Sequence, residues 1–267
     1  MLHLAGIRDW YKLVELHARG NLPSLKGFSG ELLERLVGRI TLDIDLLESE
    51  NLPALAERLS RREHWRLYPW FYERAVFLDI ETTGSDPEST QVTVISTFSA
   101  GDGPEVFIDG FNMHHFHKKA QSIEFVVTFN GSTFDIPILQ RTFPKLSPCA
   151  HVDLRWLCQR LGMKGALKSV EKALGIERHP EVRGLTGSDA VVLWRRWILF
   201  SDRAALERLV RYNLEDTMNL PVLLHELLER LYTRAGFDFR NLGEKLRQVE
   251  RQAWWIDVGM LLGELGV

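Results

Sequence analysis

Two pairs of carboxylates, each separated by one residue, are the features of this sequence most directly suited to chemistry. The stretch LDIETTG contains Asp79 and Glu81, and the stretch LDID contains Asp43 and Asp45. Carboxylate oxygens are the ligands that magnesium and manganese prefer in proteins. A pair can share a cation only if its side chains point the same way, so the element that carries each pair decides between them.

The pair Asp79 and Glu81 follows AVFL, a run with the length and composition of a buried strand. Residues two apart in a strand project from the same face, so both carboxylates should emerge side by side at the end of the strand. The nearest basic residue in sequence, Arg74, precedes the strand, and two adjacent buried anions without a partner are costly. A divalent cation, Mg²⁺ or Mn²⁺, is the expected partner.

The pair Asp43 and Asp45 has an ambiguous setting, because the apolar residues around it fit both a strand and a helix. In a helix the two acids would point about 200° apart and could not share a cation, and Thr41 would be the N-cap. In a strand they would share a face, but the one opposite the apolar face. Both settings favour a structural or solvated role for this pair.

Three residues further along the chain could complete a site at Asp79 and Glu81. The predicted strand FVVTFNG is followed by STFD, which places Asp135 at or just before a helix start, where helix capping alone would explain an acid. In RYNLEDTMNL, Tyr212 and Asp216 are four apart and share a helix face, as many surface pairs do. Their order along the chain allows all five groups to converge on one sheet edge.

The motifs FLDIETTG, FNGSTFD and YNLED together resemble the three exonuclease motifs of the DEDD superfamily of 3′–5′ exonucleases. A tyrosine four residues before the last aspartate is similar to the DEDDy branch of that superfamily. The segments LKSVEKALGIER and GSDAVVLWRRW resemble the YprB-like group of predicted exonucleases. The resemblance covers about residues 74–232 and implies a ribonuclease H-like α/β fold, in which a mixed sheet is flanked by helices.

Carried over by position, the resemblance implies that Asp79, Glu81 and Asp216 bind one divalent cation. Asp79 would also hold a second, with Asp135 acting directly or through water, and Tyr212 would orient or help deprotonate the attacking water. Two cations about 4 Å apart generate hydroxide and stabilise both the attacking and the leaving oxygen at phosphorus. Nearby polar residues are expected to contact the terminal nucleotide: Thr82, Thr83 and Asn130.

The expected protein is therefore an enzyme, a metal-dependent 3′–5′ exonuclease that acts on single-stranded or frayed nucleic-acid ends and releases nucleoside monophosphates. The same motifs occur in enzymes of DNA and of RNA. One alternative is a non-catalytic module on the same fold that binds nucleic acid or protein. Another is an endonuclease of the ribonuclease H type, which does not need a helical tyrosine.

The periodicity of apolar residues divides the chain into a helical N-terminal region, residues 1–72, an exonuclease domain, residues 73–234, and a helical tail, residues 235–267. Within the domain, AVFLDI, QVTVISTFSA and PEVFIDG predict a three-stranded antiparallel meander, and FVVTFNG with the helix after it predicts a parallel βα unit.

The second half of the domain reads as helical. Asp153 is a predicted N-cap or first-turn acid, Gly175 a predicted helix end, and Ser188 a predicted helix start. A long helix is expected over residues 202–231. Trp65, Trp194 and Trp197 alternate with arginines in helical settings, which predicts tryptophans in the core and arginines outside.

Composition narrows the class of protein. The net charge of −3 argues against a broad basic face that coats nucleic acid, although bound cations can reverse the charge locally. Two cysteines and no secretion signal predict a reduced, cytoplasmic protein, and no apolar run approaches the roughly 18 residues of a membrane helix.

His114 and His117 have a spacing that could bind zinc, but no cysteine or second histidine pair lies at a suitable spacing to complete the site. This favours a solvated loop or a patch near substrate phosphate.

Overall fold

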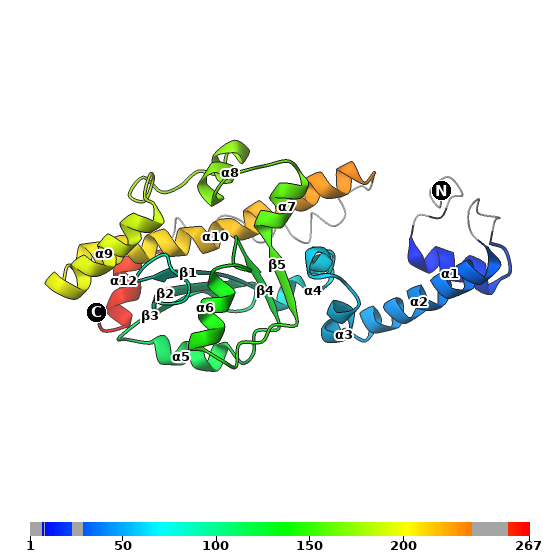
Figure 1. Cartoon of the computed structure of the whole chain (residues 1–267), viewed down its shortest axis with the longest axis horizontal. Helices are drawn as coiled ribbons and strands as arrows, with labels where there is room; N and C mark the ends of the chain where they lie inside the picture. The colour runs from blue at the N-terminus through cyan, green and yellow to red at the C-terminus, as the bar shows by residue number, and fades with distance from the viewer. Residues whose placement is uncertain (1–6, 8, 23–28, 237–255) are drawn as a thin grey trace. The chain divides into compact units, whose positions relative to one another are not determined.

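The computed structural model describes residues 7, 9–22, 29–236 and 256–267 of the chain (Figure 1). The chain divides into two compact units, Met1–Ser60 and Arg61–Val267. Within the described residues, none of the helices combines the length and the apolar character that a bilayer crossing requires.

The described residues of the first unit contain the helices α1 (Trp10–Ala18), α2 (Gly30–Glu48) and α3 (Leu52–Glu57). Their N-caps are Asp9, Ser29 and Asn51, and each side chain accepts a hydrogen bond from the backbone N–H three residues later. Apolar residues spaced along α1 and α2 form a small core that includes Leu13 and Val37.

The stretch LDID lies inside α2, so Asp43 and Asp45 project from different sides of a helix and cannot share a cation. Asp43 instead forms an ion pair with Arg58. The expectation that Thr41 caps this helix is wrong, because α2 begins at Gly30, and the Thr41 hydroxyl donates to the Val37 carbonyl 3.0 Å away.

The second unit is built on a five-stranded sheet in the order β3-β2-β1-β4-β5. Its strands are β1 (Ala75–Thr82), β2 (Val92–Ser99), β3 (Gly103–Ile108), β4 (Phe125–Thr128) and β5 (Ala150–Asp153). The first three are antiparallel, β4 is parallel to β1, and β5 is parallel to β4. The predicted mixed sheet, a meander plus parallel strands flanked by helices, is confirmed.

Helices cover both faces of this sheet (Figure 1). The described helices that follow β3 in the chain are α5 (Met113–Lys119), α6 (Asp135–Thr142), α7 (Leu154–Arg160), α8 (Leu167–Leu174), α9 (Gly187–Phe200), α10 (Arg203–Arg234) and α12 (Val258–Glu264). The short helices η2 (Arg61–Arg66), α4 (Tyr68–Phe71) and η3 (Tyr72–Arg74) precede β1.

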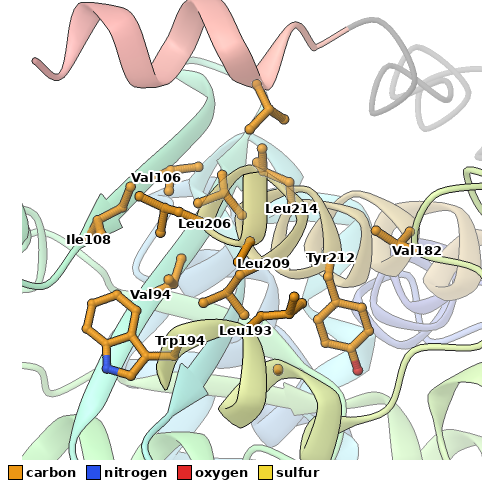
Figure 2. Packing of buried hydrophobic residues seen from close by; sticks show 14 of the residues in the cluster. Val94, Val106, Ile108, Val182, Leu193, Trp194, Leu206, Leu209, Tyr212 and Leu214 are labelled. Atoms are coloured by element: carbon orange, nitrogen blue, oxygen red, sulfur yellow. The ribbon is translucent and has the colours of Figure 1, made fainter. Parts of the chain in front are cut away.

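The alternation of side chains in the strands separates two cores. Val94 of β2 packs with Leu209 of α10 and with Leu193 and Trp194 of α9, as Figure 2 shows. On the opposite face, Ile80 and its neighbours pack with residues of α5 and α6. The sheet is therefore buried on both sides, which explains the continuous apolar character of its central strands.

Most of the predicted helix signals hold. Asp153 is the N-cap of α7, Gly175 ends α8 in the left-handed conformation, and Asp202 caps α10. The start predicted at Ser188 is wrong by one residue: α9 begins at Gly187, because Thr186 is the N-cap in a reciprocal capping box with Asp189. Of the predicted tail helix, Val258–Glu264 is helical, and the residues before 256 lie outside the described part of the chain.

The remaining sequence predictions concern tryptophans and histidines. Trp65 and Trp194 are buried and Trp197 is partly buried, while Arg195 and Arg196 are exposed, as expected. The histidines of the HHFH segment are exposed on the short helix α5: His114, His115 and His117.

Candidate active site

Strand β1 presents Asp79 and Glu81 to the face of the sheet that α10 covers. Asp79 lies opposite Ser96, and Glu81 lies opposite Val94, a residue of the core beneath α10. The register of the pairing with β2 shifts between Glu81 and Thr82, an irregularity in the ladder at the position where the carboxylates emerge, and Thr82 then pairs with Val92.

Hydrogen bonds from the sheet hold α10 in register with the strand acids. The Ser96 hydroxyl donates to the Asn213 carbonyl at 2.9 Å and lies 2.5 Å from the Thr217 hydroxyl. The side-chain amide of Asn213 donates to Asp79 Oδ2 at 2.7 Å. Because Tyr212 and Asp216 each immediately precede one of these anchors on α10, both are brought to the strand acids.

Asp79, Glu81 and Asp216 form the one group of three or more potential metal ligands in the described residues. One carboxylate oxygen from each lies within 4.8 Å of the others. Asp135, the first residue of α6, lines the same cavity of about 490 Å³. The donors are all oxygen, so this set fits a hard divalent cation such as Mg²⁺ or Mn²⁺.

The cavity brings together every residue that sequence reasoning placed in the site. Its lining includes the two strand acids, the acid at the start of α6, the two groups on α10, and the three expected nucleotide contacts: Asp79, Glu81, Asp135, Tyr212, Asp216, Thr82, Thr83 and Asn130. The carboxyl ends of β1 and β4 meet at this edge of the sheet because the two strands are parallel.

Burial and mutual repulsion raise the pKa values of these acids. Desolvation, followed by the neighbouring Asp216 carboxylate, raises the pKa of Asp79 and of Glu81 well above their usual values. Desolvation is also the main cause that raises the pKa of Asp135 to about 7. The cluster therefore retains protons near neutral pH unless cations replace them.

Arg178 is a part of the site that sequence reasoning missed. Its buried guanidinium forms an ion pair with Asp216 and two hydrogen bonds with Glu171, at 2.6 and 2.8 Å. Asn219 donates to the same Glu171 carboxylate at 3.0 Å. A buried charge is tolerated when it is paired in this way, so Arg178 holds the Asp216 carboxylate in a fixed orientation.

Lys168 is the second missed residue. Its ammonium donates a hydrogen bond to the Tyr212 hydroxyl at 2.7 Å and another to the Leu185 carbonyl. Burial, followed by the charges of Asp216 and Glu81, raises the pKa of Tyr212, so the phenol is neutral. The hydrogen bond from Lys168 uses a lone pair of the phenol oxygen. The phenol O–H can therefore donate a hydrogen bond to another group.

The loop between β4 and α6 is clamped by Asp153. This carboxylate accepts hydrogen bonds from the backbone N–H of Asn130 at 2.8 Å and of Ser132 at 3.1 Å, besides capping α7. Asn130 has a φ of +66°, a left-handed conformation that asparagine tolerates better than most residues. The clamp therefore sets the path of the chain just before Asp135.

The three expected nucleotide contacts also have structural partners. The Thr82 hydroxyl donates to the Gly84 carbonyl at 2.6 Å, and the Thr83 hydroxyl accepts from the Gln91 N–H at 3.0 Å. The amide oxygen of Asn130 accepts from the Thr133 hydroxyl at 3.1 Å. Each of these oxygens thus helps to shape the wall of the cavity.

Replacing Gly131 with alanine is expected to destabilise the fold by about 1–3 kcal/mol and to reduce activity. A Cβ at this position would lie 2.2 Å from the Thr128 hydroxyl oxygen, and Thr128 is fully buried and hydrogen-bonded to His151. The loop that leads to Asp135 must then shift. Thermal unfolding measures the effect, with Gly101→Ala, where a Cβ meets nothing, as the control. Equal stability of the two variants would contradict this packing.

The mixed sheet with a carboxylate cluster at one end of its central strand describes the fold and the candidate site, and the comparison by sequence identifies the family. Residues 76–228 match the family model RNase_H_2, described as RNase_H superfamily. The chain belongs to the RNase H superfamily. No curated protein matches the chain in sequence.

Several solved structures are similar to this chain at low identity. A family B DNA polymerase from the hyperthermophilic archaeon Pyrobaculum calidifontis is 18% identical with a TM-score of 0.42, covering 57% of this chain and 25% of the polymerase. The Nibbler EXO domain of Aedes aegypti is 16% identical with a TM-score of 0.36, covering 68% and 90%. A nuclease in its apo form is 18% identical with a TM-score of 0.43, covering 72% and 86%. The chain thus spans a quarter of the polymerase's length.

Proposed function

We propose that this protein is a metal-dependent 3′–5′ exonuclease that hydrolyses phosphodiester bonds at the 3′ ends of nucleic acids and releases nucleoside monophosphates. The observation that carries the proposal is the triad of Asp79, Glu81 and Asp216, whose oxygens lie within 4.8 Å of one another, in a chain of the RNase H superfamily. Residues 73–234 are assigned as the exonuclease domain.

The acids have separate roles in holding cations. Asp79, Glu81 and Asp216 would hold one Mg²⁺ or Mn²⁺ ion, and Asp79 with Asp135 would hold the second. When bound, such a pair of ions lowers the pKa of the attacking water and stabilises the charge on the leaving oxygen. The raised pKa values of the buried carboxylates support this assignment, because a site that binds protons tightly also stabilises the positive charge of a cation.

The remaining polar groups position the reactants. Tyr212, neutral and held by Lys168, donates a hydrogen bond to the attacking water or to a phosphate oxygen and so fixes the line of attack. Asn213 orients Asp79, and Arg178 orients Asp216. The helical tyrosine supports membership of the DEDDy branch, and the segments around Lys168 and Trp194 support the YprB-like group within it.

Oligonucleotides with different labels and ends test the proposal. With Mg²⁺ or Mn²⁺, a single strand labelled at its 3′ end should lose the label at once as a mononucleotide, whereas a 5′ label should appear on progressively shorter products. A circular single strand should stay intact. Cleavage of the circle would instead support an endonuclease of the ribonuclease H type. Absence of both hydrolysis and Mn²⁺ uptake would support a non-catalytic binding module.

Replacing Tyr212 with phenylalanine is expected to slow hydrolysis by about 10²-fold while leaving Mn²⁺ affinity nearly unchanged. The substitution removes the hydroxyl that faces the cavity and keeps the ring that packs in the core. Single-turnover hydrolysis and calorimetric Mn²⁺ titration measure the two effects. Tyr232→Phe, a partly buried tyrosine on the same helix that does not line the cavity, is the matched control. Loss of Mn²⁺ binding in Tyr212→Phe would show that the hydroxyl has a different role.

A further inference from the structure

The exposed side of α9 carries large apolar residues among its polar ones, which is unusual for a surface helix. One side of α9 is buried through Ala190, Leu193 and Trp194. On the exposed side, Val192, Ile198 and Leu199 are 54%, 59% and 70% exposed. A surface helix normally presents polar residues to water, and a contiguous exposed apolar patch marks an interaction site.

This exposed side is continuous with the catalytic cavity. Ser188, Val191, Val192 and Arg195 line the cavity, at the spacing of residues on one helix face. Ile198 and Leu199 follow Arg195 by one further turn. We name this set the outer face of α9: Ser188, Val191, Val192, Arg195, Ile198 and Leu199. It runs roughly 16 Å along the helix, from the cavity toward the C-terminal end of α9.

The charge on the outer face is complementary to phosphate. Arg195 is exposed and makes no ion pair with any described residue, whereas its neighbour Arg196 pairs with Asp202, with Nε donating at 2.9 Å. An unpaired guanidinium beside a cavity of carboxylates is suited to a phosphate of the strand that enters it. Exposed apolar side chains on either side of it offer surfaces on which unstacked bases can lie.

We propose that the outer face of α9 binds the segment of single-stranded nucleic acid that leads into the cavity. Arg195 contacts a backbone phosphate, and Val192, Ile198 and Leu199 contact the faces of successive bases. The direction of the strand rests on the proposed exonuclease function, but its binding does not require catalysis. Since the base faces of a duplex are covered by stacking, this surface selects single-stranded or frayed ends.

Fluorescence anisotropy of a labelled oligothymidylate, measured with Mg²⁺ and the full chain, tests the proposal. Its 3′-terminal linkages are phosphorothioates, which resist hydrolysis and keep the negative charge that Arg195 is proposed to contact. The double variant Ile198→Ser with Leu199→Ser should bind about tenfold more weakly, because the apolar surface that the bases would cover is lost. Arg195→Gln should reduce the slope of log K against log salt by about 0.7, the value for one phosphate contact on a single strand. The controls Arg196→Gln and Met260→Ser, an exposed apolar residue on α12, should bind like the parent.

Equal affinity of the parent and the outer-face variants would overturn the proposal, as would binding of an intact duplex as tightly as the single strand. Analytical ultracentrifugation tests the other possible occupant of this face, a second copy of the chain. If the parent is a dimer that the apolar substitutions dissociate, and strand affinity is unchanged, the outer face of α9 is an interface between copies and the proposal is overturned. A parent that binds the strand through α9 but hydrolyses no substrate would refute the proposed exonuclease function and support the strand-binding face.

Discussion

Replacing Asp79 with asparagine is expected to lower hydrolysis by about 10³-fold or more and to abolish Mn²⁺ uptake, because this carboxylate would contact both cations. The same change should raise the melting temperature of the metal-free protein at pH 8. Burial and the neighbouring acids raise the pKa of Asp79, so its charge is unfavourable there without a cation. The amide oxygen of the new asparagine can still accept the hydrogen bond from Asn213. Activity assays, calorimetric titration and thermal unfolding measure the three effects.

The stretch LDID provides a matched control for this substitution. Asp45→Asn changes an acid in the same sequence pattern, but on the exposed surface of α2 and outside the cavity. It should leave hydrolysis and Mn²⁺ uptake unchanged. The metal-site assignment would be refuted by an Asp79→Asn protein that takes up Mn²⁺ like the parent. If metal-free Asp79→Asn melts at a lower temperature than the metal-free parent at pH 8, the carboxylates of the cluster do not repel one another in the metal-free protein.

The free energy of unfolding of the metal-free protein is expected to decrease as pH rises from about 4 to above 7. Asp135, whose pKa is raised to about 7, and Asp79 and Glu81, whose pKa values are raised well above normal, hold protons more tightly in the folded chain than in the unfolded chain. Within that window the folded state binds more protons, so raising the pH favours unfolding. The raised pKa of Asp135 alone corresponds to a decrease of roughly 4 kcal/mol in the free energy of unfolding across this pH range.

Divalent cations should reverse this trend. Because they replace the protons, the increase in melting temperature caused by Mn²⁺ should be larger at pH 8 than at pH 5. Thermal unfolding across this pH range, with Mn²⁺ or with a chelator, measures both trends. Glu215 is an internal reference: its pKa is raised to about 7 mainly by burial, and it is not among the proposed ligands, so its contribution should persist with metal bound. Metal-free stability that rises steadily with pH would contradict the raised pKa values.

Strand and helix periodicities predicted much of the fold because they depend on local spacing. The acids of LDIETTG alternate with apolar residues in a strand, so their common face follows from backbone geometry alone. The start of α6 at Asp135 and the helix that carries Tyr212 and Asp216 also follow from short-range patterns. The prediction for Thr41 failed because the apolar pattern that surrounds LDID starts at Gly30, well before the stretch itself.

The groups that orient the acids could not be predicted in this way. Glu171 and Arg178 lie on either side of the end of α8, and their link to Asp216 exists only because α8 packs near α10. Lys168 has no local feature that distinguishes it from a surface lysine, yet it contacts Tyr212 across 44 positions of sequence. Each of these contacts joins residues from different elements, and no spacing rule relates such residues.

The sequence by itself predicted which residues are candidates for chemistry in this protein and determined which elements present them, because side-chain direction in a strand or a helix is set by backbone geometry. Only the tertiary structure decided that Arg178 pairs with Asp216 and Lys168 with Tyr212, and that the outer face of α9 continues from the cavity toward solvent. Burial, charge pairing and pKa depend on distances between elements, and those distances arise only when α8, α9 and α10 pack together on the sheet.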